Sequence, residues 1–228
     1  MITTAMQRER ARLAARYLTG RGIEIGALDC PLPLPANATA RYLDRLGVAE
    51  LRAHYPELAQ RQLQEPDVID DGEHLESVPS ASLDFIVANH MLEHCEDPLG
   101  TLQVHLDRVR PGGVLFYAIP DKRKCFGKPR PLTDFRHLLA DHADGGAGSR
   151  WDHFMEWATY VNAIADPAAA AENARTNMRN EYSIHFHAWT PDTFRQFLED
   201  AGEYFQHAFS VAHLANNRTE IISVLRRN

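Results

Sequence analysis

The strongest constraint on the fold is an alternation of short apolar segments with amphipathic ones along residues 22–121. The apolar segments predict strands at residues 22–27, 39–46, 65–71, 83–90 and 114–120. Apolar residues that recur on one helical face predict helices at residues 5–18, 48–64 and 98–113. Strands that alternate with helices in this way predict a parallel sheet covered by helices on both faces.

The alternation stops after residue 121. Residues 190–202 predict a helix with Thr190 as N-cap and Pro191 in its first turn, and two strands follow around Asn216-Asn217 as an antiparallel hairpin. Residues 122–184 fit no strand–helix unit, so we expect an inserted helical cap over the substrate. The predicted fold is a single α/β domain over residues 1–228, with a doubly wound, mostly parallel seven-stranded sheet and a terminal hairpin.

Composition excludes several classes of protein. The formal net charge of −7 argues against broad nucleic-acid binding, which needs a basic surface. No apolar run approaches the roughly 18 residues that cross a membrane, and the first 18 residues lack the apolar block of a signal peptide. The three cysteines are odd in number and far apart, which favours a reduced, cytoplasmic protein.

Polar residues stand at the carboxyl ends of the predicted strands, where open parallel sheets bind their ligands. Asp44 follows the first turn by about 20 residues, a position from which a carboxylate can accept both hydroxyls of a ribose. Asp71 can accept from the exocyclic amine of an adenine. Glu24, together with carbonyls near Gly26 and Asn89, can meet an ammonium group.

The same edge offers no phosphate cradle, because no glycine loop here carries a lysine. An adenosine with a positively charged amino-acid end therefore fits better than a dinucleotide. Two simpler interpretations remain open: Asp44 as a helix cap, and Asp71-Gly72 as a plain turn.

At this point the segments EIGA, YLDR, IDDGEHL, SLDFIVANHMLEH and RVRPGGVLFYAIPD, in this order, resemble the motifs of class I S-adenosylmethionine-dependent methyltransferases. The resemblance covers residues 22–121 and 185–227. It implies S-adenosylmethionine as cofactor. It also implies that Asp44 contacts the ribose and Asp71 the adenine, with Arg45 and Gly72 beside them. The resemblance further implies that Glu24 and Gly26 belong to the loop that binds the methionine part of the cofactor. It implies that Asn89 and His90 form the floor beneath the sulfur. The family's first motif carries further glycines, where this chain has Leu28 and Cys30.

The downstream segments PDKRKCFGKPRPLTDFRHLL, SRWDHFMEW and YSIHFHAWTPDTF resemble a bacterial methyltransferase group associated with surface-glycan biosynthesis. All three lysines of the chain lie within residues 122–128, directly after Asp121. We expect Asp121, Lys122, Arg123 and Lys124 to bind an anionic or sugar-linked small molecule that is methylated on a hydroxyl. A solvated loop is the simpler interpretation.

A hydroxyl acceptor needs a base with a pKa near neutrality, for which histidine is the natural choice. The candidates are His187, His185 and His153, in that order. These histidines have no fixed metal-ligand spacing, so we expect no metal. Two other functions remain open: a non-catalytic binding subunit with this fold, and a methyltransferase that acts on a protein or another metabolite.

Overall fold

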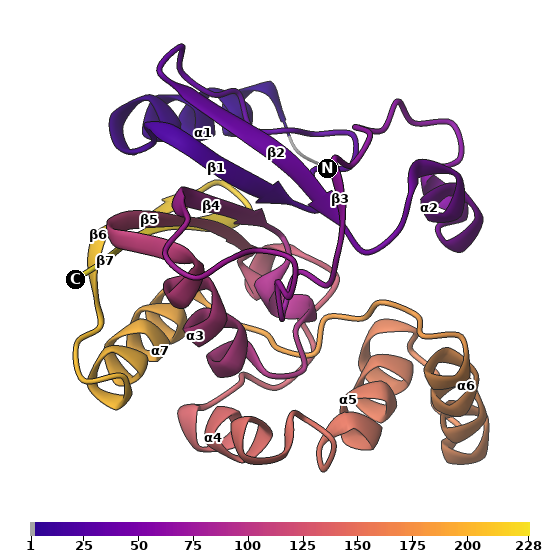
Figure 1. The fold of residues 1–228 in the computed structure, drawn as a ribbon. Helices are drawn as coiled ribbons and strands as arrows, with labels where there is room; N and C mark the ends of the chain where they lie inside the picture. Colours follow the sequence, from indigo (N-terminus) through magenta and orange to yellow (C-terminus); the bar gives the residue numbers. More distant parts are fainter. Residues whose placement is uncertain (1–2) are drawn as a thin grey trace.

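The computed structural model describes residues 3–228, which form a seven-stranded sheet with helices on both faces (Figure 1). The strand order is β3-β2-β1-β4-β5-β7-β6. Neighbours among β1 to β5 pair in parallel, whereas β7 is antiparallel to β5 and to β6. The predicted fold class is therefore confirmed. The strands are β1 (Gly20–Ile25), β2 (Ala38–Asp44), β3 (Val68–Ile69), β4 (Leu83–Asn89), β5 (Val109–Pro120), β6 (Phe209–Asn217) and β7 (Glu220–Arg227).

Alternate residues of each central strand build two separate cores. Phe85 and Val87 of β4 pack toward α1 (Thr4–Tyr17), while Ile86 and Ala88 face the opposite side of the sheet. That side is covered by α3 (Pro98–Arg108) and α7 (Pro191–Tyr204) (Figure 1). Burial on both faces explains why these strands read as continuous apolar runs.

The segment between β5 and α7 is mainly helical. It contains a short 3-10 turn (Lys122–Lys124), α4 (Phe135–Asp144), α5 (Arg150–Glu156), a π-helical turn (Trp157–Val161) and α6 (Pro167–Arg179). Helices α5 and α6 lie side by side, away from the sheet (Figure 1). Their apolar cluster is separate from the sheet cores and consists of Phe154, Trp157, Ala174, Ile184 and Phe186.

Several predicted boundaries were wrong. The helix expected over residues 48–64 is only α2 (Val48–His54) and a 3-10 turn (Pro56–Leu58), because a residue before proline disfavours the helical conformation. The helix expected to be closed by Pro111, Gly112 and Gly113 already ends at Arg108, since Val109 pairs with β4. The final hairpin turns at Arg218-Thr219, two residues after the predicted Asn216-Asn217.

Over residues 3–228, no helix combines the length and the apolar character that a membrane crossing requires.

Candidate active site

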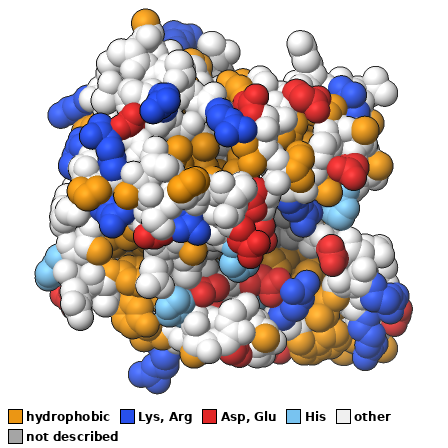
Figure 2. All heavy atoms as spheres, in the orientation of Figure 1, with side chains coloured by type: hydrophobic (Ala, Val, Ile, Leu, Met, Phe, Trp, Pro, Cys, Tyr) orange, Lys and Arg blue, Asp and Glu red, His pale blue; other side chains and the backbone are white. Residues whose placement is uncertain are grey.

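A pocket of about 380 Å³ opens at the carboxyl edge of the sheet, beside the neighbouring strands β1 and β4. The strand order reverses here, because β2 follows β1 on one side and β5 follows β4 on the other. This volume lies within the range of small-molecule sites. Figure 2 shows the hollowed face of the molecule, with acidic and histidine side chains along the hollow. Seven of the residues predicted to bind the cofactor line the pocket: Gly26, Asp44, Arg45, Asp71, Gly72, Asn89 and His90.

The loop after β1 holds its shape with few glycines. Gly26 has a φ of +63°, and open space lies where a Cβ atom would point. Leu28 also adopts the left-handed conformation, with a φ of +49°, at a position where glycine is the easier choice. Glu24 is buried under the loop, where its carboxylate accepts the Leu32 N–H at 2.9 Å. Burial raises the pKa of Glu24 to about 7. Glu24 does not line the pocket, and its contact with Leu32 ties down the loop.

The two strand-end aspartates differ in their surroundings. Asp44 is half-buried, and burial raises the pKa of its carboxyl group. Asp44 does not cap α2, which begins after Gly47. Asp71 is more exposed, and one of its oxygens is 3.1 Å from the His74 ring. Gly72 allows close packing, since a Cβ atom there would lie 2.6 Å from the Ile25 side chain.

Asn89 supplies unused hydrogen-bonding capacity at the floor of the pocket. Its amide nitrogen and oxygen are both buried, and neither has a hydrogen-bond partner among the described residues. Buried polar groups are ordinarily paired, so an unpaired amide in a pocket points to a polar ligand. S-adenosylmethionine carries both donors and acceptors, and the residues present fit it.

His90 lies at the end of β4 between two buried carboxylates. Its Nε2 is 2.9 Å from Glu220 and its Nδ1 is 3.4 Å from Glu93. Burial opposes the charged ring, but the hydrogen bonds with the two carboxylates prevail and raise the pKa of His90 to about 9. Burial likewise opposes the Glu93 carboxylate, yet the His90 ring lowers the pKa of Glu93 to about 2. Arg10 of α1 donates hydrogen bonds to both oxygens of Glu220, so that Glu93, His90, Glu220 and Arg10 alternate in charge.

His94, Tyr182 and Ser183 line the pocket beyond His90. His94 Nδ1 donates to the Ile184 carbonyl at 2.8 Å. This contact assigns the proton to Nδ1, and Nε2 is then the basic nitrogen. Burial lowers the pKa of His94, which favours the neutral ring.

The three histidines proposed as bases lie elsewhere. His187 is completely buried and His153 nearly so, and of the residues described neither is part of the pocket wall. His185 packs edge-on against the His94 ring, at 4.6 Å between centroids. Burial, followed by the neighbouring His94, lowers the pKa of His185 to about 3. Of the three candidates, only His185 therefore lies next to the pocket, and none of them lines it.

Most cations of the basic segment after β5 have partners within the protein. Asp121 is buried and accepts from Arg123 at 2.9 and 2.8 Å, so these two charges pair with each other. Arg130 is buried and donates to backbone carbonyls of His185 and Phe186. The three lysines, at positions 122, 124 and 128, are at least partly exposed. Lys122 Nζ donates to the Lys128 carbonyl at 3.1 Å, and Lys124 Nζ donates to the Arg218 carbonyl at 2.7 Å.

Sequence reasoning did not assign His94, Tyr182 or Ser183 to the site. His94 lies in a 3-10 turn (Leu92–His94) just beyond a predicted strand end, which was the one available signal. Tyr182 and Ser183 come from a distant segment, and only the fold brings them to this edge.

Comparison with known proteins gives one match over most of the chain: a family model described as "Methyltransferase domain" matches residues 4–207. No curated protein sequence matches. Among solved structures, an S-adenosylmethionine-dependent methyltransferase from Mesorhizobium loti is 14% identical, with a TM-score of 0.53, and the match covers 98% of this chain and 99% of that one.

Two further structures show the range of similarity. A protein from Rhodobacter sphaeroides, provisionally named a Zn-dependent alcohol dehydrogenase, is 12% identical, with a TM-score of 0.51 and full coverage of both chains. The CurJ carbon methyltransferase is 13% identical, with a TM-score of 0.47, and the match covers 92% of this chain but only 49% of that one. At such identities the likeness concerns the fold alone.

Proposed function

The chain belongs to the methyltransferase-domain family and uses S-adenosylmethionine, and on this premise we propose that it methylates a hydroxyl group of an anionic, sugar-linked small molecule. One observation carries the proposal: a single pocket extends from the carboxylates of Asp44 and Asp71, past the unpaired amide of Asn89, to the His94 ring. S-adenosylmethionine supplies a methyl group on a positively charged sulfur.

The residues of the pocket have distinct roles in this proposal. Asp44 would accept the ribose hydroxyls, Asp71 the adenine amine, and Asn89 would pair with the amino-acid end of the cofactor. The Gly26 backbone leaves room for close approach. In-line placement of the two reactants supplies most of the rate enhancement expected of such a site.

We assign the base to His94 in place of His187, His185 and His153. The assignment rests on three features of His94: it lines the pocket, burial favours its neutral form, and the Ile184 carbonyl holds the proton on Nδ1. Nε2 is then free to take the proton of an acceptor hydroxyl. General base catalysis of this kind contributes roughly 10²–10⁴-fold to rate.

The preference for an anion rests on the position of the basic segment. The Phe126 ring lies 4.7 Å from the His185 ring, which in turn contacts His94. The lysine-bearing loop is thereby next to the His94 end of the pocket. Arg130 is buried and already paired, so the anion clamp reduces to the cations that are at least partly exposed: Lys122, Arg123, Lys124 and Lys128.

Methyl transfer from radiolabelled S-adenosylmethionine to a panel of acceptors tests the proposal. The panel pairs each sugar phosphate or nucleotide sugar with its neutral sugar. We expect transfer to anionic members, and a several-fold rise in acceptor KM in the Lys122→Gln/Lys124→Gln double variant, with cofactor affinity unchanged. The substitution Arg195→Gln, on the exposed surface of α7, is the charge control. Preference for neutral acceptors, or a KM insensitive to the lysines, would contradict the anionic acceptor.

A further inference from the structure

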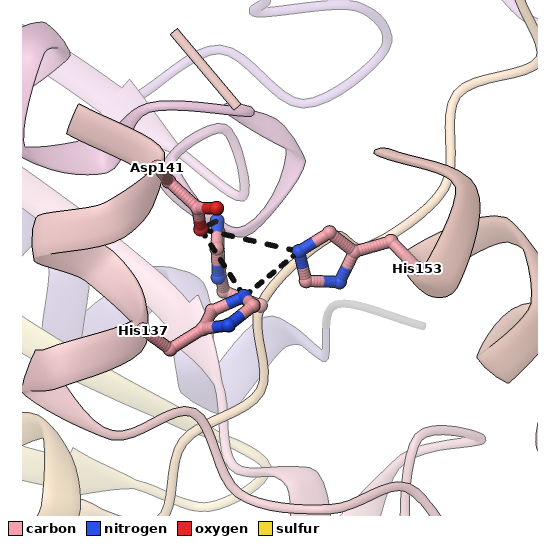
Figure 3. Close-up of side chains that lie close together, drawn as sticks. His137, Asp141 and His153 are labelled. Atoms are coloured by element: carbon pink, nitrogen blue, oxygen red, sulfur yellow. Dashed lines mark hydrogen bonds and ion pairs between the residues drawn. The ribbon is translucent and has the colours of Figure 1, made fainter. Parts of the chain in front are cut away.

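Four potential metal ligands converge from three segments of the chain. His137 and Asp141 lie one turn apart on α4, and His153 projects toward them from α5 (Figure 3). His137 Nε2 is 3.0 Å from His153 Nε2 and 3.1 Å from Asp141 Oδ2. His187, on the extended segment 184–189, places its Nε2 3.8 Å from the same carboxylate oxygen. All four donor atoms lie within 4.8 Å of one another, so one ion can contact them all.

The centre of this cluster is buried and incompletely paired. Asp141 is 1% exposed and His187 is 0% exposed. Neither Asp141 Oδ2 nor His187 Nε2 forms a hydrogen bond within the part of the chain that is described, residues 3–228. Unpaired buried polar atoms are unfavourable, and the four atoms that converge here are all of the kind that donates electron pairs to a cation.

The surrounding residues hold the ligands in place. Ser149 donates its hydroxyl to Asp141 Oδ1 at 2.5 Å, which leaves Oδ2 to face the histidines. Gly145 and Gly146, both with positive φ, reverse the chain between α4 and α5, and a Cβ atom on Gly146 would lie 2.8 Å from the Glu96 side chain. Metal ligands commonly depend on such outer contacts for their orientation.

We propose that His137, Asp141, His153 and His187 bind one Zn²⁺ ion, which cross-links α4 and α5 to segment 184–189. Three imidazoles and a carboxylate suit zinc, whose ligands lie about 2.0–2.2 Å from the metal. Tetrahedral ligand atoms are then about 3.4 Å apart, close to the separations observed here. Because four protein atoms complete the coordination, the ion is structural, and it replaces the catalytic roles first considered for His187 and His153.

Metal analysis of the tag-free full chain tests the site. We expect one equivalent of zinc by mass spectrometry after reconstitution with Zn²⁺ and desalting, and tetrahedral d–d absorption when Co²⁺ replaces it. The variants Asp141→Asn and His187→Gln should bind Zn²⁺ at least about 100-fold more weakly than the wild type. His142→Gln is the matched control, because His142 lies on the same helix but pairs with Asp97 at 2.8 Å. It should retain the full equivalent of zinc.

Thermal melting gives a second measurement. Added Zn²⁺ should raise the Tm of the chelator-treated wild type and of His142→Gln, and should leave Asp141→Asn unchanged. A wild type that takes up no stoichiometric metal and gives no tetrahedral Co²⁺ spectrum would overturn the proposal, even if the variants failed to fold. So would zinc binding that the Asp141 and His187 substitutions leave intact, since the cluster would then be a hydrogen-bonded network only.

Discussion

Asp44 is the residue whose environment bears most directly on cofactor binding. A half-buried carboxylate at the end of β2 can make charge-assisted hydrogen bonds that water does not replace well. We expect Asp44→Ala to lose about 1.5–3 kcal/mol of binding free energy, or roughly 10–100-fold in the affinity for S-adenosylmethionine. Calorimetry on the variant measures this loss. Asp107→Ala, on the surface outside the pocket, should bind like the wild type, and an unchanged affinity in Asp44→Ala would contradict the ribose contact.

His90 should make stability depend on pH. The folded pKa of about 9 lies above the ordinary value of 6.5, so the protonated ring stabilises the fold. This contribution is complete below pH 6.5 and disappears as the pH rises from 6.5 to 9. The full shift corresponds to about 3 kcal/mol, and solvent screening of the partly exposed ring reduces it, so we expect the free energy of unfolding to fall by about 1–3 kcal/mol over that interval. Denaturant titrations at several pH values measure it. His90→Gln should lack most of this dependence, and an equal slope in both proteins would argue against the charged ring.

Seven residues predicted from their positions at strand ends line one pocket, although their roles in cofactor binding remain predictions. They lie together because parallel strands place their carboxyl ends at a common edge. The base candidates came from a different argument, the need for a histidine near the acceptor, and the alternation of His185 with His187 gave no measure of their depth in the protein. The His137–Asp141 spacing of four was the only local sign of the histidine cluster, since its other members come from separate segments.

Among the elements, α7 has a well-defined start. The Thr190 hydroxyl accepts the Thr193 N–H at 3.3 Å, and Pro191 occupies the first turn, both as predicted. Loss of such a cap costs about 0.5–2 kcal/mol. We therefore expect Thr190→Ala to lower the free energy of unfolding by this amount in urea titrations. Thr190→Ser keeps the hydroxyl and should recover most of the loss; if Ser and Ala behaved alike, the cap would not be the cause.

Elements of the sheet were predictable because burial on both faces leaves a clear apolar pattern. The boundaries that failed are those decided by neighbours. Val109 leaves α3 because Leu83 of β4 offers a pairing partner, and β3 keeps only Val68–Ile69 in the ladder with β2. Local helix preference carries no information about these pairings.

At the scale of the whole molecule, Arg10 joins α1 to β7 through Glu220, with both side chains almost fully buried. Removing one partner of an isolated buried pair costs about 3–5 kcal/mol, but Glu220 keeps its contact with His90 at 2.9 Å. We therefore expect Arg10→Met to be destabilised by about 2–4 kcal/mol in chemical denaturation. Arg12→Met breaks the exposed pair with Glu9 and should cost at most about 1 kcal/mol. Similar small effects in both variants would contradict the importance of the buried pair.

The order of the last two strands has a consequence for how the protein folds as it is synthesised. Strand β7 follows β6 in the chain but lies between β5 and β6 in the sheet. Until residues 220–227 leave the ribosome, the edge of β5 that pairs with β7 has no partner. Arg10 likewise lacks its carboxylate partner, Glu220, which lies 210 positions downstream. Long-range pairings of this kind form late and slowly, and exposed edges invite association with other chains. A nascent chain paused before residue 220 is therefore the species most in need of a chaperone.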